Sequence, residues 1–356
     1  MNPPQKHSMS AVEYSLADIW AQALKLETVE AEDNFFNLGG HSLLALSVIE
    51  QIKLRLGWII SLSTFIQYPT IRELVTNASQ PTAANSERLL IRMSKRGRLK
   101  PIVFVPAIGG MIFSYTKLAR HLSANRSCYA LQSPALIGQS VPETISLLAA
   151  LYIETLISEL GTNDFHLVGW SYGGLVAFEM MRQLGTGANR KLVLIDSFLR
   201  PEKRTLPDEE VIFKAFVDDL LSQFGMQADM PEGISRPQAL QALAARLFGA
   251  HANNGDAQSF EFIERMYHAY LANLQAMMAY QCGAADVSAA LLFPTESNDT
   301  VAHWRDRVDN LEVIDLQGDH YSLLNDKNAA QIATATAAYL DQPAFVEQRA
   351  DAGVQL

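Results

Sequence analysis

The sequence predicts a small helical bundle followed by a mainly parallel α/β sheet with helices on both faces, interrupted once by a purely helical insertion. Three observations support this prediction. Apolar residues recur at helical spacing through residues 11–77. From residue 89 onward, short apolar runs alternate with helical patterns, as buried parallel strands do. Between residues 200 and 284 only helical periodicity is found. A chain of 356 residues, 49% of them hydrophobic, can bury two cores of unequal size.

The N-terminal part is predicted to be a bundle of four short helices. An acidic loop with an aromatic pair precedes the second helix, and Gly57 ends that helix. The polar, proline-containing residues 78–88 form a short linker. The four helices are expected at residues 11–26, 43–56, 61–68 and 71–75. The chain is therefore divided into a leader at 1–10, the bundle at 11–77, the linker at 78–88, the sheet domain at 89–342 with its insertion at 200–284, and a tail at 343–356.

The sheet domain is predicted from repeated strand–helix units. An all-helical insertion between strands of such a sheet is a candidate lid. Strands are expected at residues 89–94, 101–106, 128–132, 165–168, 191–195, 289–293 and 311–316. Helices are expected at 115–123, 141–160, 175–184 and 329–340, with 208–224, 237–248 and 259–280 in the insertion.

Composition excludes several classes of function. A net charge of −10 and a pI near 5.3 argue against nucleic acid or an anionic membrane as a partner. No apolar run approaches the roughly 20 residues of a membrane span. Cys128 and Cys282 belong to no CxxC pair, which favours buried thiols in a reducing compartment and no metal site. We expect a cytoplasmic protein.

The most informative stretch is Gly169-Trp-Ser-Tyr-Gly-Gly174, which lies between a buried strand and a helix. This is the context that a G-x-S-x-G motif requires. Glycines at 169 and 173 relieve crowding in the sharp turn, so that the Ser171 hydroxyl stands clear of the sheet above a helix N-terminus. The alternative is a glycine-rich turn with an idle serine. We predict that Ser171 is a nucleophile.

Such a serine needs a base, and histidine has the suitable pKa. His320 lies in Gly-Asp-His-Tyr-Ser after the last expected strand, so it is placed at the carboxyl ends of the strands, toward which Ser171 also points. The other histidines are interpreted as ordinary core or surface residues. They are His7, His41, His121, His166, His251, His268 and His303.

The base needs a carboxylate that holds its tautomer. Asp196 directly follows the strand after the Ser171 helix, which puts it at the same edge of the sheet. Glu296 and Asp299, after the next strand, remain alternatives, whereas Asp319 is too close in sequence to turn onto its neighbour's ring. We favour Asp196. The order Ser, Asp, His along the chain is the one that α/β-hydrolases use.

An oxyanion formed by attack of Ser171 requires backbone donors. One is the N–H of Tyr172, directly after the nucleophile. The second is expected from the glycine-containing loop after the strand at 101–106. We assign it to Ala107, with Ile108 as the alternative one residue along.

The bundle carries a second motif at Ser42, the first residue of its second helix. Spacing alone favours a simple helix cap, because serine is a preferred N-cap. However, DNFFNLGGHSLLAL and the later TFIQYPTIREL resemble the peptidyl carrier domains of nonribosomal peptide synthetases over residues 11–77. The resemblance implies that Ser42 carries a covalent 4′-phosphopantetheine arm, added by a phosphopantetheinyl transferase, whose thiol holds an acyl or peptidyl chain. The stretch at 58–61, WIIS, departs from the usual pattern.

The sheet domain has a resemblance of its own. VFVPAIGGMIFSYTKLA, LVGWSYGGLVAFEMM, KLVLIDS and GDHYSLL are similar to type I thioesterase domains that end nonribosomal peptide or polyketide assembly lines. That family places its acid after the strand following the Ser171 helix, which supports Asp196.

Taken together, the two resemblances imply a peptidyl carrier–thioesterase terminal didomain of secondary-metabolite biosynthesis, with condensation and adenylation modules as upstream partners. It would release an acyl or peptidyl thioester by hydrolysis or cyclisation. The alternatives are a stand-alone serine esterase or lipase with an appended helical interaction module, and a non-catalytic carrier scaffold.

Overall fold

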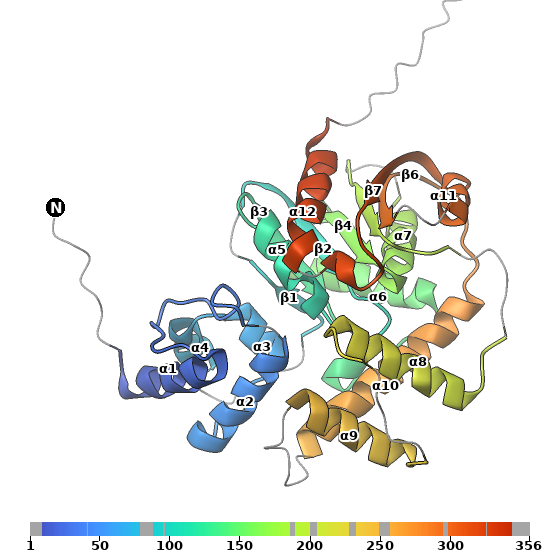
Figure 1. Ribbon diagram of the computed structural model, residues 1–356. Coiled ribbons are helices and arrows are strands. Elements are labelled where there is room, and N and C mark those ends of the chain that lie inside the picture. The colour runs from blue at the N-terminus through green and yellow to red at the C-terminus, as the bar shows by residue number, and fades with distance from the viewer. Residues whose placement is uncertain are drawn as a thin grey trace, which may run out of the picture.

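The computed structural model describes residues 9–40, 42–78, 88–94, 97–185, 189–199, 205–227, 233–248, 257–294, 298–324 and 326–343. It shows a helical bundle beside an α/β domain (Figure 1). Most of the expected linker, together with the start of the leader and nearly all of the tail, lies outside the described residues. The bundle consists of α1 (Ala11–Leu24), α2 (Ser42–Leu56), α3 (Leu62–Gln67) and α4 (Ile71–Ala78).

Local sequence explains why the bundle helices begin and end where they do. The Ser10 hydroxyl accepts a hydrogen bond from the Glu13 N–H while the Glu13 carboxylate accepts one from the Ser10 N–H, which is a complete capping box at the start of α1. Lys25, at φ 57°, ends that helix. The fully buried rings of Trp20, Phe35 and Phe65 meet at centroid distances of 5.0–5.5 Å. The core of the bundle is therefore aromatic.

The α/β domain is built on one seven-stranded sheet with the strand order β1-β3-β2-β4-β5-β6-β7. Strand β1 is antiparallel to β3, and all other neighbouring strands are parallel. The strands are β1 (Leu90–Arg92), β2 (Leu99–Val105), β3 (Arg126–Leu131), β4 (His166–Trp170), β5 (Leu192–Ile195), β6 (Ala285–Pro294) and β7 (Val308–Leu316). Because the strands are mainly parallel, their carboxyl ends form one edge at which a site can be assembled.

Helices cover both faces of this sheet. Alternate strand residues supply the two cores, so that Val103 and Val105 pack on one face and Ile102 and Phe104 on the other. On the first face lie α6 (Ile145–Leu160), α7 (Tyr172–Leu184) and α11 (Asn298–Arg305), and on the second lie α5 (Thr116–Leu122) and α12 (Asp326–Asp341). With its helical insertion, this is the α/β-hydrolase fold.

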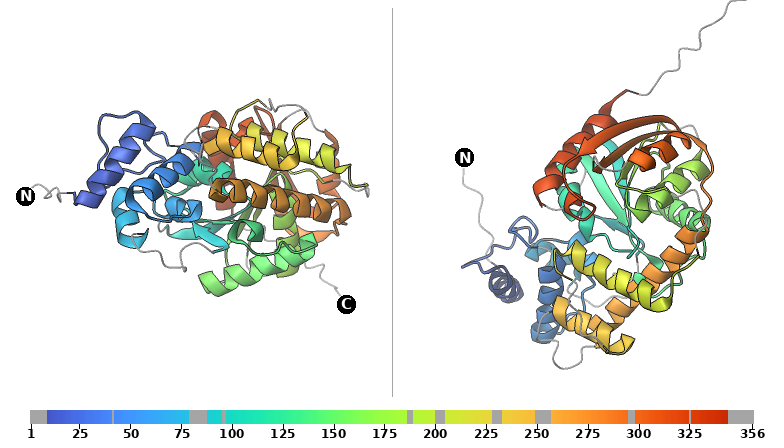
Figure 2. Two further views of the ribbon diagram at one scale, coloured as in Figure 1. Left: turned by 90° about the horizontal axis from the view of Figure 1, so that it is seen from below. Right: turned by 45° about the vertical axis from the view of Figure 1, so that its right-hand side comes forward.

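The insertion consists of three helices that pack around a core of their own. They are α8 (Glu209–Gln223), α9 (Arg236–Phe248) and α10 (Ala257–Ala279). The views show these helices next to the bundle at one end of the sheet, and α2 contacts α9 (Figure 2). Ile66 of α3 is buried in the same cluster as Ile91 of β1. The bundle is thus packed on the α/β domain near the insertion.

Some boundaries differ from the sequence-based expectation. Helix α6 begins at Ile145 and not at residue 141, because the Thr144 hydroxyl accepts from the Leu147 N–H and caps the helix there. Helix α7 begins at Tyr172, directly after the glycine-rich turn. None of the described helices combines the length and the apolar character needed to cross a bilayer.

Candidate active site

The turn between β4 and α7 holds Ser171 at φ 56° and ψ −127°, a conformation that non-glycine residues rarely adopt. The Ser171 N–H donates to the Ile195 carbonyl at 2.9 Å, so the turn is tied to the neighbouring strand. A Cβ on Gly169 would overlap the Gly173 carbonyl, and a Cβ on Gly173 would overlap the Val105 carbonyl. Both glycines are therefore required by close backbone packing.

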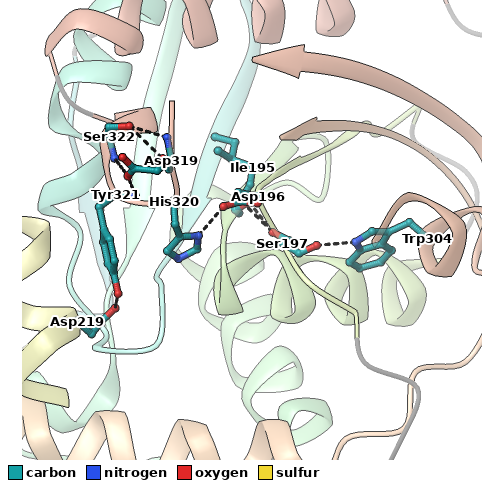
Figure 3. Close-up of polar contacts among 10 residues, drawn as sticks. Ile195, Asp196, Ser197, Asp219, Trp304, Asp319, His320, Tyr321 and Ser322 are labelled. Atoms are coloured by element: carbon teal, nitrogen blue, oxygen red, sulfur yellow. Dashed lines mark hydrogen bonds and ion pairs between the residues drawn. The ribbon is translucent and has the colours of Figure 1, made fainter. Parts of the chain in front are cut away.

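Asp196 and His320 meet beside this turn. Asp196 follows β5, is 3% exposed, and lies at φ 40°, where its N–H donates to the Leu292 carbonyl at 2.7 Å. Its Oδ2 lies 2.6 Å from Nδ1 of His320, a residue of the loop after β7 (Figure 3). This contact fixes which ring nitrogen is engaged and leaves Nε2 for another partner. No hydrogen bond of the Ser171 hydroxyl is formed within the described parts of the chain.

Three other carboxylates close in sequence to these strand ends are candidates for the partner of His320: Asp319, Glu296 and Asp299. Asp319 accepts from the N–H groups of Tyr321 and Ser322, each at 3.0 Å, and these bonds hold the pKa of its carboxyl below the usual range. It therefore stabilises its own turn, whereas Asp196 makes the contact with Nδ1 of His320. Glu296 lies outside the described residues, and Asp299 lies in α11 with its side chain not described.

His166 illustrates a histidine with a structural role. It lies in β4, is 4% exposed, and its Nδ1 accepts from the Lys191 N–H at 3.0 Å. Burial lowers its pKa to about 3, helped by nearby cations such as Lys100. It is therefore a neutral core residue, as the sequence interpretation expected.

Aromatic rings enclose His320. Its ring centroid lies 5.0 Å from that of Trp170 and 5.9 Å from that of Phe198. Tyr321, the next residue, donates through its hydroxyl to Asp219 of α8 at 3.2 Å (Figure 3). Burial raises the pKa of the Asp219 carboxyl, and hydrogen bonds from Tyr321 and Gln223 partly oppose this shift. A helix of the insertion is thus joined directly to the histidine loop.

The loop after β2 contains Ala107, the expected second oxyanion donor, and Ile108, its alternative. It is held by a residue that the sequence reasoning did not single out. Asn273 of α10 is 3% exposed, donates to the Ile108 carbonyl at 2.8 Å and accepts from the Tyr172 hydroxyl at 3.2 Å. Tyr172, one expected donor, and Ile108, the alternative to Ala107 as the other, are therefore both anchored to the same amide of the insertion.

Two further anchors were also missed. The buried Tyr115 hydroxyl donates to the Val105 carbonyl at 2.6 Å and accepts from the Trp170 N–H at 2.8 Å, which joins the ends of β2 and β4. The Trp304 indole donates to the Ser197 carbonyl at 2.7 Å, directly beyond Asp196. No local sequence pattern marks either one, because the bonds Trp170–Tyr115 and Trp304–Ser197 span 55 and 107 positions.

Ser42 begins α2, as the motif predicted, although its side chain is not described. The loop just before it forms one wall of a cavity of about 730 Å³ between the bundle and the α/β domain. Phe36, Gly39 and Gly40 line this cavity from the bundle, and Trp170 and Tyr321 line it from the α/β domain. One space therefore connects the neighbourhood of Ser42 with residues adjacent to Ser171 and His320.

Comparison with protein families identifies both parts of the chain. The model of the thioesterase domain matches residues 100–339, and that of the phosphopantetheine attachment site matches residues 15–77. Malpinin synthetase of Mortierella alpina is 30% identical over 230 residues, which are 63% of this chain and 3% of that protein. Indigoidine synthase of Streptomyces lavendulae is 32% identical over 173 residues, which are 48% of this chain and 14% of that protein. The chain thus spans only a small part of these relatives.

Solved structures agree with this result. The crystal structure of holo-AB3403, a four-domain nonribosomal peptide synthetase bound to AMP and glycine, is similar with a TM-score of 0.65 at 27% identity, covering 96% of this chain and 27% of that one. The wild-type Vlm2 thioesterase domain, at 19% identity and a TM-score of 0.55, covers 71% of this chain and 98% of that one, and shows the fold. Because the thioesterase model covers more than half of the residues, the chain belongs to the thioesterase domain family, with a phosphopantetheine attachment domain ahead of that domain.

Proposed function

We propose that this chain releases acyl or peptidyl chains in nonribosomal peptide biosynthesis, with Ser42 as the attachment site and Ser171, His320 and Asp196 as the catalytic triad. The observation that carries the proposal is the 2.6 Å contact between Asp196 and His320 beside Ser171 at positive φ. The cavity shared by the Ser42 loop and the residues next to the triad supports delivery from the chain's own carrier domain. We take residues 11–77 and 89–342 as the two functional domains.

The residues present fit a phosphopantetheine arm at Ser42. Two glycines without side chains, Gly39 and Gly40, line the cavity two to three residues from the serine. Met111 and Phe113 offer apolar surface in the same cavity. When bound, the arm supplies a thiol that carries the chain as a thioester. A phosphopantetheinyl transferase attaches it, and upstream condensation and adenylation modules provide the chain.

In the first half-reaction, Nε2 of His320 takes the hydroxyl proton of Ser171 as its oxygen attacks the thioester carbonyl. The Asp196 carboxylate accepts from Nδ1–H, which holds the tautomer and stabilises the imidazolium. Backbone N–H groups of Tyr172 and Ala107, or of Ile108 in its place, stabilise the oxyanion. The C–S bond breaks, His320 returns its proton to the sulfur, and an ester on Ser171 remains.

In the second half-reaction, His320 removes a proton from the incoming nucleophile, which attacks the Ser171 ester. Water gives a free acid, and an amine or hydroxyl of the chain itself gives a cyclic product. The insertion helices decide between these outcomes by controlling how much water reaches the ester.

The decisive experiment follows release from the loaded carrier. The chain is modified at Ser42 with an acyl-coenzyme A and a phosphopantetheinyl transferase, and loss of the acyl group is timed by intact mass. We expect Ser171→Ala to load normally but to release at least about 10³-fold more slowly. Ser42→Ala should not load, and Ser158→Ala, an exposed serine on α6, should match the parent. Release by Ser171→Ala at the parent's rate would refute the proposal.

A further inference from the structure

The cavity between the bundle and the α/β domain has an uneven distribution of charge. Of the described residues that line it, three carry a formal charge: Lys117 and Arg120 of α5, and Asp319. The Asp319 carboxylate accepts two backbone N–H bonds within its own turn. Two cations against this one carboxylate leave the described lining net positive, in a chain whose net charge is −10. A site with two cations in an acidic protein favours an anionic ligand.

The two cations lie on one face of the same helix. Residues three apart are neighbours on a helix surface, so Lys117 and Arg120 project side by side. That face meets the bundle, because Nη1 of Arg120 donates to the Phe36 carbonyl at 3.4 Å. Phe36 and Gly40 line the same cavity. Gly40 is only two residues from Ser42, and two residues of chain span at most about 7 Å. The cations therefore face the attachment end of the bundle.

We infer that Lys117 and Arg120 form a binding site on the thioesterase domain for the phosphodiester of the arm attached to Ser42. An alkyl phosphodiester carries one negative charge and two free acceptor oxygens. A guanidinium and an ammonium three residues apart can engage both oxygens with charge-assisted hydrogen bonds. Holding the phosphate at α5 directs the rest of the arm past Met111 and Phe113 toward Trp170. This inference rests on the proposed function of Ser42 and extends it to a recognition site.

The test measures binding directly. The probes are pantetheine and the O-methyl phosphodiester of 4′-phosphopantetheine, which has the same charge as the attached arm. Both are titrated by calorimetry or NMR into the full chain carrying Ser42→Ala and Ser171→Ala, so that the cavity holds no attached arm and no turnover occurs. We expect the phosphodiester to bind about tenfold more tightly than pantetheine, and the difference to shrink with added salt.

Adding Lys117→Gln and Arg120→Gln should bring the two dissociation constants to within about twofold of each other. Arg305→Gln, a neutralisation of an exposed residue on α11, should keep the tenfold difference. Equal affinities for the two probes before the glutamine substitutions, or a tenfold difference that survives them, would overturn the inference. Failure of the proposed function would be seen in a different experiment. There, the loaded Ser171→Ala variant would release its acyl group as fast as the loaded parent.

Discussion

On the sheet side of the candidate active site the backbone itself fixes the chemical groups, whereas on the insertion side single side-chain hydrogen bonds do so. Ser171 and Asp196 both lie at positive φ, and their N–H groups donate to the neighbouring strands β5 and β6. On the other side, Asn273 of α10 holds the loop at Ile108, and Asp219 of α8 holds Tyr321. The strand ends are part of the buried core, whereas each of these two insertion contacts is a single polar pair.

This difference suggests a division of roles. A backbone conformation buried within a sheet opens only with the whole domain, so Ser171 and Asp196 keep a fixed geometry. Contacts made by one amide or one carboxylate can be broken at a cost of about 1–3 kcal/mol. We propose that the insertion acts as a lid that opens and closes over the site while the strand ends stay in place. The predictions below perturb first one side and then the other.

The largest effect is expected from Gly173→Ala on the sheet side. The added Cβ would overlap the Val105 carbonyl and approach that of Pro106, and backbone atoms at a strand end cannot move aside. We expect the free energy of unfolding to fall by about 3 kcal/mol, with loss of acyl release. Urea unfolding measures this. Gly283→Ala, whose Cβ would meet only Arg182 Cδ at 3.9 Å, is the matched control. Equal stability of the two variants would show that the turn is not tightly packed.

On the insertion side, Asn273→Ala leaves the Ile108 carbonyl and the Tyr172 hydroxyl without their amide partner. We expect a loss of about 1–3 kcal/mol of stability, and a fall in kcat of about tenfold because the loop of the oxyanion donors is no longer held. Tyr172→Phe is the matched variant, since it removes one of the two bonds and keeps the backbone N–H. It should retain most of kcat. Full kcat in folded Asn273→Ala would make Asn273 a packing residue only.

Sequence patterns revealed the sheet side well, and the physical reason is that its determinants are local. The glycines around Ser171 and the position of Asp196 after a strand can be seen within a few residues. The structure brings Asp196 and His320 together across 124 positions because parallel strands share one carboxyl edge. Their catalytic roles remain our proposal.

The insertion side could not be predicted in the same way. Helical periodicity located α8 and α10, but it does not tell which polar residue faces which loop. Asn273 lies 165 positions from Ile108, and Tyr321 lies 102 positions from Asp219. Such pairs depend on how the insertion packs on the sheet, which no local pattern specifies. The same holds for the cavity at Lys117 and Arg120, because it exists only between two packed domains.

The smallest expected effect is a dependence on pH at Asp219. Burial raises the pKa of this carboxyl above its ordinary value of 3.8, so its ionisation costs more in the folded state than in the unfolded one. Its contribution to stability is therefore most favourable below pH 3.8 and is lost as pH rises through the folded-state pKa. Asp219→Asn can still pair with Tyr321 and Gln223 and removes this loss. We expect it to be more stable than the parent at pH 7, with a smaller advantage as the pH falls toward 3.8.

Tyr321→Phe should act in the opposite direction. The hydrogen bond from the Tyr321 hydroxyl lowers the pKa of Asp219. Without it, the ionised carboxylate is still less favourable in the folded state. The variant should therefore lose more stability than the parent between acidic and neutral pH. Thermal unfolding of the three proteins from pH 4 to pH 8 gives the comparison. Asp219→Asn could instead be less stable than the parent at pH 7. In that case the contacts of the ionised carboxylate with the histidine loop would contribute more free energy than burial of its charge costs. The insertion would then be clamped at neutral pH, and closure over Ser171 would weaken on acidification.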